Sequence, residues 1–168
     1  MELLTAIDTR TSAGRLSHPG PTPEHLALIL DAAAHAPDHG RLRPWRIIVL
    51  EAELRESFSL AAAAAKRAGL PGMSDEQFAA ERDKLARSPR IVVVGCSVRR
   101  DQTKIPEIEQ VIAAAAAAQN LFLAAHDLGY GVMWKTGAAA YDSAVKATVG
   151  LAPDDHIVAI MHLGTRLK

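Results

Sequence analysis

The chain has 168 residues, the usual length of one folded domain, so we expect residues 1–168 to form a single domain. Nineteen Lys and Arg residues balance nineteen Asp and Glu residues, so no net charge attracts nucleic acid or anionic lipid, and neither is expected as a partner. A single cysteine excludes an internal disulfide, and the lack of a signal peptide or an apolar run of ~20 residues predicts a soluble cytoplasmic protein outside the membrane.

Helical and strand patterns alternate along the chain, which is typical of a mixed α/β fold. Apolar residues spaced three and four apart indicate helices, and continuous β-branched runs indicate strands. Prolines and glycines separate these segments. In chain order we expect a helix over 2–10, a helix over 23–36 capped by Thr22, a strand over 45–50, a helix over 52–68, a helix from 74 to about 87, a strand over 91–94, a helix over 107–128, a strand over 132–134, a helix over 141–149 and a strand over 156–164.

The longest helical pattern, over 107–128, is apolar on nearly every side. Six consecutive alanines at 113–118 permit close approach of a neighbouring helix, and Ile112, Leu121 and Leu128 widen the apolar stripe. A helix that is apolar all round is buried all round. In a chain of this length, we therefore expect a partner subunit to cover part of this helix.

Two residue types that often carry chemistry are better explained here by structure. Cys96 ends a continuous β-branched run, which predicts a buried and unreactive thiol. His35 and His39 are four residues apart, as metal ligands on one helix face would be. Pro37 lies between them and breaks the helix, so no metal site is expected.

Arg10-Thr11-Ser12 places a cation and two hydroxyl groups at the end of the first expected helix. Guanidinium and hydroxyl donors suit a phosphate or a ribityl chain, and a solvated polar loop also explains them. The pair Gly129 and Gly131 lacks the third glycine of a dinucleotide fingerprint and follows a helix, so a tight turn is expected there. From these residues alone, phosphate binding and a polar loop both stay open.

Four segments in series resemble the nitroreductase family. Their order and spacing fit essentially the whole chain, and the short length with its Ala-Pro-Asp-His sequence resembles the YdjA-like bacterial branch. The resemblance implies a central, mostly antiparallel sheet of about four own strands flanked by helices, in an intertwined homodimer. The segments are Ala6–Arg15; Ala34–His39 followed by Arg43–Arg46; Ala118–Ala125 followed by Leu128–Gly131 and Trp134–Gly137; and Leu163–Thr165.

The resemblance further implies an FMN-dependent oxidoreductase. Such an enzyme takes hydride from NADH or NADPH and passes it to an electron-poor acceptor, for example a nitroaromatic or a quinone, in a ping-pong cycle. Flavin N5 carries the hydride, so no catalytic side chain and no metal are implied. The FMN sites would lie at the subunit interface.

The resemblance also assigns roles to individual residues. It implies that the loop after the first helix binds the phosphate and ribityl groups of FMN, and that residues 134–136 lie along the flavin ring. The two histidines would contact FMN from the other subunit. Lys135 is expected to stabilise the reduced, anionic flavin. The implied FMN-binding residues are Arg10, Thr11, Ser12, His35, His39, Trp134, Lys135, Thr136 and Arg166.

The sequence departs from the family pattern at several of these positions. Thr11 stands where many relatives have a second basic residue, and His35 stands where the short branch often has arginine. Arg41 and Arg43 replace Asn and Gln, and they suit either a substrate anion or a solvated loop. Two alternative functions therefore stay open: a flavin carrier or sensor with little reductase turnover, and a dimerisation domain without a cofactor.

Overall fold

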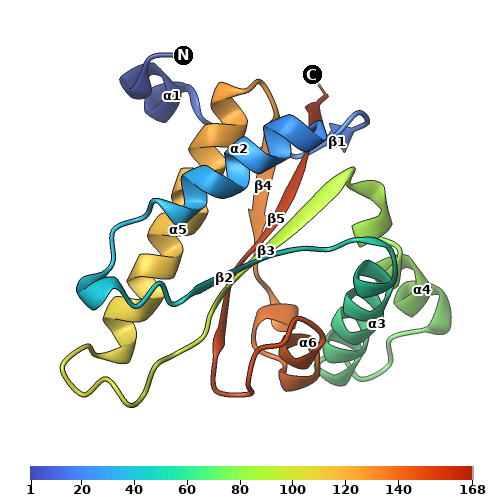
Figure 1. Ribbon diagram of the computed structural model, residues 1–168. Helices are drawn as coiled ribbons and strands as arrows, with labels where there is room; N and C mark the ends of the chain where they lie inside the picture. Colours follow the sequence, from blue (N-terminus) through green and yellow to red (C-terminus); the bar gives the residue numbers. More distant parts are fainter. Residues whose placement is uncertain (168) are drawn as a thin grey trace.

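An antiparallel sheet with helices on both faces forms the fold in the computed structural model, which describes residues 1–167 (Figure 1). The expected mixture of helices and antiparallel strands is confirmed. The helices are α1 (Leu3–Thr9), α2 (Pro23–Ala34), α3 (Ala52–Ala68), α4 (Asp75–Arg82), α5 (Glu107–Asp127) and α6 (Ser143–Thr148), with 3-10 turns η1 (His39–Arg41), η2 (Leu85–Arg87) and η3 (Ala138–Ala140). The strands are β1 (Leu16–Ser17), β2 (Trp45–Val49), β3 (Arg90–Cys96), β4 (Gly131–Lys135) and β5 (His156–Arg166).

Strand β5 is the centre of the sheet. It pairs antiparallel with β3, with β4 and, near its end, with the two-residue strand β1, while β2 pairs with the far edge of β3. The pairing sets His162 of β5 opposite both Ile91 of β3 and Met133 of β4. All four strands expected from the sequence are present. The additional strand β1 escapes a sequence pattern because two residues carry no periodicity.

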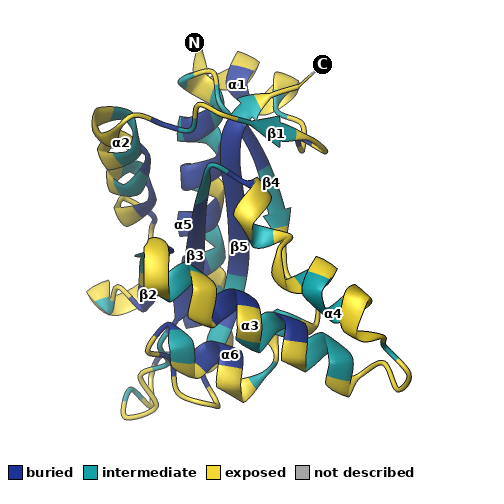
Figure 2. Ribbon diagram, turned by 90° about the vertical axis from the view of Figure 1, so that its right-hand side faces the viewer, coloured by how far each residue is buried: buried dark blue, intermediate teal, exposed yellow. Residues whose placement is uncertain are grey.

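The helices cover the two faces of the sheet in separate layers (Figures 1 and 2). On one face, α2 and α5 pack on apolar residues such as Val92, Val94 and Met161. On the other face, α3 and α6 pack on their neighbours Ile91 and Val93, together with other apolar residues. This alternation is the period-two pattern of a strand buried on both sides.

Helix α5 is buried against the sheet along one side and exposed along another. By length and composition it could cross a membrane, yet eight of its residues, mostly alanines, are buried inside the protein. This is the placement of a helix that packs in the core. Within one chain, Ile108 and Ile112 are 63% and 60% exposed, and this is the side of the helix that the partner subunit expected from the sequence would have to cover.

The helix expected from 74 to about 87 is shorter in the structure. A capping box joins Ser74 and Gln77 at its start, and α4 ends at Arg82. A 3-10 turn, η2, follows, and Ser88 then takes an extended conformation, as a residue before proline must. Similarly, α6 begins at Ser143 because Asp142 accepts the backbone N–H groups of Ala144 and Val145.

Gly164 of β5 lies in close contact with two other segments of the chain, at Pro89 and at Ser17. A Cβ at this position would lie 2.9 Å from ring atoms of Pro89 and 2.9 Å from the carbonyl oxygen of Ser17. We expect Gly164→Ala to lower the free energy of unfolding by about 1–3 kcal/mol, the usual cost of overpacking. Urea denaturation measures this loss. Gly14→Ala is the control, because a Cβ at Gly14 would meet nothing within 4 Å. Equal stability of the two variants would contradict the prediction.

Candidate active site

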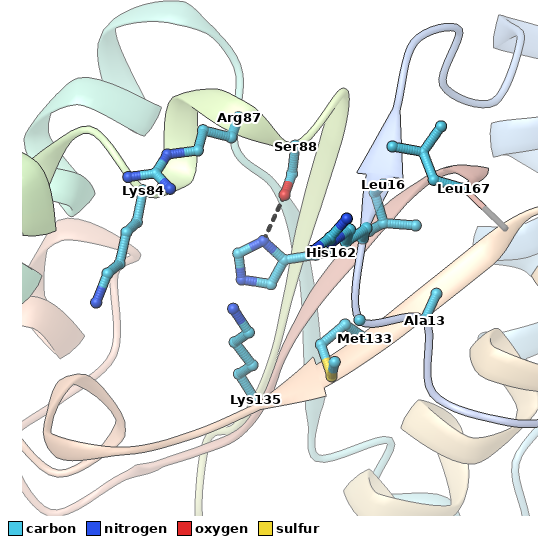
Figure 3. Close-up of a pocket in the computed structure, with 11 residues that line it drawn as sticks. Ala13, Leu16, Lys84, Arg87, Ser88, Met133, Lys135, His162 and Leu167 are labelled. Atoms are coloured by element: carbon cyan, nitrogen blue, oxygen red, sulfur yellow. Dashed lines mark hydrogen bonds between the residues drawn. The ribbon is translucent and has the colours of Figure 1, made fainter.

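A cavity of about 400 Å³ opens on the sheet face that carries α3 and α6, beside the turn η2 (Figure 3). Strand residues of β4 and β5 form its base, and the 13–16 segment and η2 form its sides. The volume lies within the range of ~300–1,000 Å³ that is usual for small-molecule sites. The lining residues are Ala13, Gly14, Arg15, Leu16, Lys84, Arg87, Ser88, Met133, Lys135, His162 and Leu167.

The cavity concentrates positive charge in a chain that has none overall. Four of its lining residues, Arg15, Lys84, Arg87 and Lys135, are cations, and no lining residue is a carboxylate. Lys84 forms an ion pair with Glu81 of α4. Within residues 1–167, the other three cations have no carboxylate within 4.0 Å. The cavity is therefore suited to an anionic ligand rich in hydrogen-bond acceptors.

A buried histidine forms part of the cavity wall. The His162 side chain is 4% exposed, and its Nδ1 lies 2.7 Å from Oγ of Ser88. Burial, followed by repulsion from Lys135 and Arg55, lowers the pKa of His162 to about 4. The ring is therefore neutral at pH 7, which is the form that low-polarity surroundings favour.

The loop after α1 is held against the end of β5. Nη1 of Arg166 donates to Oγ1 of Thr11 at 2.7 Å, and Nη2 donates to its carbonyl oxygen at 2.6 Å. The Arg10 guanidinium lies 4.8 Å from the ring centre of Phe122 on α5. The structure thus brings together Arg10, Thr11 and Arg166, with Ser12 next in the chain. This group adjoins the cavity, because Ala13 and Leu167 are lining residues.

The segment at the end of β4 divides between the two faces of the sheet. Lys135 points into the cavity, and Thr136 follows it as an exposed residue. The neighbouring residue, Trp134, packs with the core on the α5 side and donates its indole N–H to the carbonyl oxygen of Val158 at 3.2 Å. Alternation along the strand places Trp134 outside the cavity lining, so within one chain it does not form a wall beside Lys135.

The two sequence-predicted histidines lie elsewhere. His35, at the end of α2, is exposed to solvent, and its Nε2 lies 3.4 Å from the carboxylate of Asp31. Nδ1 of His39 lies 2.7 Å from the carboxylate of Glu109, which is thirteen residues before Phe122 on α5, or about 20 Å along the helix axis. His39 therefore does not reach the Arg10 loop within one chain, and neither histidine lines the cavity. Among the described residues, no group of three His, Cys, Asp or Glu side chains is arranged to hold a metal ion.

The loop that contains Arg41 and Arg43 is conformationally strained. Both residues have positive φ values, of 56° and 47°, although neither is glycine. The Asp38 carboxylate accepts the backbone N–H of Arg43 at 2.8 Å, which helps to hold the loop. Both arginine side chains are exposed, and neither lines the cavity.

Cys96 is fully buried at the end of β3. Burial, followed by repulsion from Asp155 and Glu107, raises the pKa of its thiol to about 11. The thiol stays protonated at neutral pH and out of contact with solvent. The prediction of a buried, unreactive cysteine is confirmed.

Sequence reasoning missed five polar residues of the cavity, of which Arg15 lies just after the predicted Arg10–Ser12 donors. Lys84 and Arg87 lie in a stretch that the pattern assigns to an exposed helix, and Ser88 had no role beyond ending that helix. His162 had a detectable signal, because it is the one polar residue between Ile157 and Leu163 in an otherwise apolar strand. A polar residue in a buried strand requires a partner, and only the fold shows that the partner is Ser88.

The depressed pKa of His162 predicts a loss of stability in mild acid. The unfolded chain binds a proton below the ordinary pKa of 6.5, whereas the folded ring stays neutral to about 4, so stability falls as the pH drops through this window. We expect a contribution of about 2 kcal/mol to be lost between pH 7 and pH 5. Urea denaturation at both values, for the wild type and His162→Gln, measures it. An equal loss in both proteins would contradict the prediction.

Sequence comparison places the chain among known proteins. A model of the nitroreductase family matches residues 7–165. The Escherichia coli K12 protein named "Putative NAD(P)H nitroreductase YdjA" is 35% identical over 165 residues, which cover 98% of this chain and 88% of that protein. A Haemophilus influenzae protein named "Putative NAD(P)H nitroreductase" is 31% identical over 169 residues, which cover 100% of this chain and 90% of that protein.

Solved structures share the fold. A nitroreductase-like family protein from Bacillus cereus has a TM-score of 0.83 at 24% identity, over 100% of this chain and 87% of the other. A nitroreductase from Desulfovibrio desulfuricans, solved in complex with FMN, has a TM-score of 0.75 at 24% identity, over 100% of this chain and 88% of the other. At this level of identity, the likeness establishes the architecture alone.

Proposed function

The chain belongs to the nitroreductase family, and from that premise we propose that it is an FMN-dependent oxidoreductase. It transfers hydride from NADH or NADPH to an electron-poor acceptor such as a nitroaromatic or a quinone. Two relatives above 30% identity carry NAD(P)H nitroreductase names, and FMN is bound in a structure of the same fold. The observation that carries the proposal is the cavity with four cations and no carboxylate.

The residues around the cavity fit FMN. Its phosphate is a dianion, and Ser12 and Arg166, in the segments that adjoin the cavity, supply hydroxyl and guanidinium donors. Arg10 of the same loop is a further proposed donor, although its guanidinium lies over Phe122 on α5 in this structure. Lys135 supplies an ammonium inside the cavity, where it would stabilise negative charge on a reduced ring. Bound FMN would supply the hydride-accepting and hydride-donating chemistry. Arg166 also acts as a positioning residue, because its two hydrogen bonds, one to the hydroxyl and one to the carbonyl oxygen of Thr11, hold the loop.

An acid–base pair is not needed for hydride transfer, and none of the lining residues forms one: His162 is neutral and its partner is a serine hydroxyl. The open cavity serves the reductant and then the acceptor in turn, which is the ping-pong order. A shared site also accounts for the missing third glycine after Gly131, because no separate dinucleotide fold is required.

We propose that two copies of the chain form the complete site. Apolar side chains are exposed on α1, where Leu3 and Leu4 are 66% and 79% exposed, and on α5 at Ile108 and Ile112. Isoleucines four residues apart form a continuous stripe on one helix face, which association with a second copy would bury. His35 and His39, which do not reach the cavity of their own chain, would contact FMN in the partner's site.

Flavin reduction tests the function directly. We expect the purified protein to bind FMN, and the visible absorption of the bound flavin to bleach when NADH or NADPH is added without oxygen. Adding an acceptor should restore the colour with steady consumption of the reductant. Bound flavin that neither nucleotide reduces would favour a carrier or sensor, and a protein that binds no FMN would contradict the assignment.

A lysine pair locates the flavin site in the same assay. Lys135→Met removes a charge-assisted hydrogen bond, so we expect the Kd for FMN to rise at least about tenfold. Lys104→Met is the matched control, because Lys104 is exposed and lies outside the cavity. An unchanged Kd for FMN in Lys135→Met would contradict the placement of FMN in this cavity.

Sedimentation velocity tests the dimer. We expect the wild type to sediment as a dimer, and Ile112→Glu to shift the protein toward the monomer and lower its FMN content, because it buries a charge in the interface. Leu60→Glu, which changes a leucine on α3 that is 51% exposed, is the control and should remain dimeric. A flavin-loaded wild-type monomer would contradict the proposal.

A further inference from the structure

We propose that His162 is an additional flavin contact, whose Nε2–H donates a hydrogen bond to an acceptor atom of FMN beside Lys135. This inference rests on the proposed function and extends it by one residue and one type of interaction. The family resemblance assigns no role to this position. The inference comes from the hydrogen-bonding of a buried ring, the residues that surround it and the opening of the cavity beside it.

The His162 ring has one satisfied nitrogen and one free nitrogen. Nδ1 is bonded to Ser88 at 2.7 Å, whereas Nε2 has no partner among residues 1–167. Among the same residues, the side-chain nitrogen and oxygen atoms that are fully buried and lack a hydrogen-bond partner belong to Arg55 and Arg67. Nε2 of His162 is not one of them, so this unpartnered atom is accessible from the cavity that His162 lines. Figure 3 shows the ring between Ser88 and Lys135. A buried side chain, 4% exposed, thus presents an unused polar atom to a ligand site.

Ser88 determines which nitrogen carries the hydrogen. The Ser88 side chain is buried, and the described residues offer its hydroxyl hydrogen no acceptor except Nδ1 of His162. An unsatisfied buried hydroxyl is costly, so Oγ–H donates to Nδ1. The neutral ring then carries its hydrogen on Nε2. Arg55 of α3 fixes this serine by donating to its carbonyl oxygen.

The surroundings of Nε2 determine what it binds. The Lys135 ammonium is also a donor, and no carboxylate lines the cavity, so the ligand must bring the acceptor. An isoalloxazine ring has two carbonyl oxygens and unprotonated ring nitrogens, and it gains negative charge on reduction. A neutral N–H adds a hydrogen bond there without the desolvation cost of a buried cation. The low pKa of His162 keeps it in that form across the physiological range.

The inference is tested on the apoprotein by FMN titration and by the midpoint potential of the bound flavin. His162→Phe keeps a flat ring and loses the N–H donor, so we expect the Kd for FMN to rise about 3- to 10-fold and the potential to become more negative. His162→Gln keeps an N–H donor and should recover much of the affinity. His156→Phe, on the same strand but paired with Glu107, is the control and should match the wild type.

Nitrogen NMR of the wild-type imidazole gives a second measurement that needs no variant. We expect a protonated Nε2 at pH 7 whose resonance shifts when FMN binds. A hydrogen on Nδ1, or a resonance that FMN leaves unchanged, would overturn the inference even if a variant failed to fold.

The outcomes separate the inference from the proposed function. A wild-type protein that binds no FMN would overturn both. FMN binding and a potential that are unaltered by His162→Phe would overturn the inference alone. A higher KM for the acceptor, with unchanged Kd and potential, would assign the imidazole to the acceptor and would also overturn the flavin contact.

Discussion

Backbone pairing along both edges of β5 is the constraint on which the cavity depends. The pairing sets His162 opposite Met133, Lys135 opposite Ile160, and Arg166 opposite Leu16. A slip of one residue in either register would turn these side chains to the other face of the sheet. The lining residues therefore converge because β1, β3 and β4 all pair with the same long strand, β5. These pairings bring the N-terminal segment, η2, β4 and β5 to one side of the sheet.

The distribution of charge within a neutral chain gives this convergence its chemistry. Four cations surround the cavity, Glu81 holds one of them, and the His162 ring beside them is uncharged. A protonated ring would add a buried charge next to Lys135 and Arg55, so the fold favours the neutral donor. An anionic ligand relieves the repulsion among the cations, and its binding then stabilises the folded state.

Much of the secondary structure follows from local sequence. A continuous β-branched run marks β3 and an apolar run marks β5, and the caps at Thr22 and Ser74 mark the starts of α2 and α4. Local sequence fails where tertiary contacts decide the conformation. The strand β1 exists because β5 accepts two residues at its end, and α4 stops early because η2 must turn toward the sheet before Pro89.

The sequence by itself determined the family, the mixed antiparallel architecture and the donor-rich character of Arg10, Thr11 and Arg166. The tertiary structure decided which donors share a cavity. It added Lys84 and His162, and it turned Trp134 to the opposite face from Lys135. The physical reason is that hydrogen bonding and charge act through space. A pattern along the chain reports which groups exist, whereas strand register and burial determine which groups meet and which protonation state they keep.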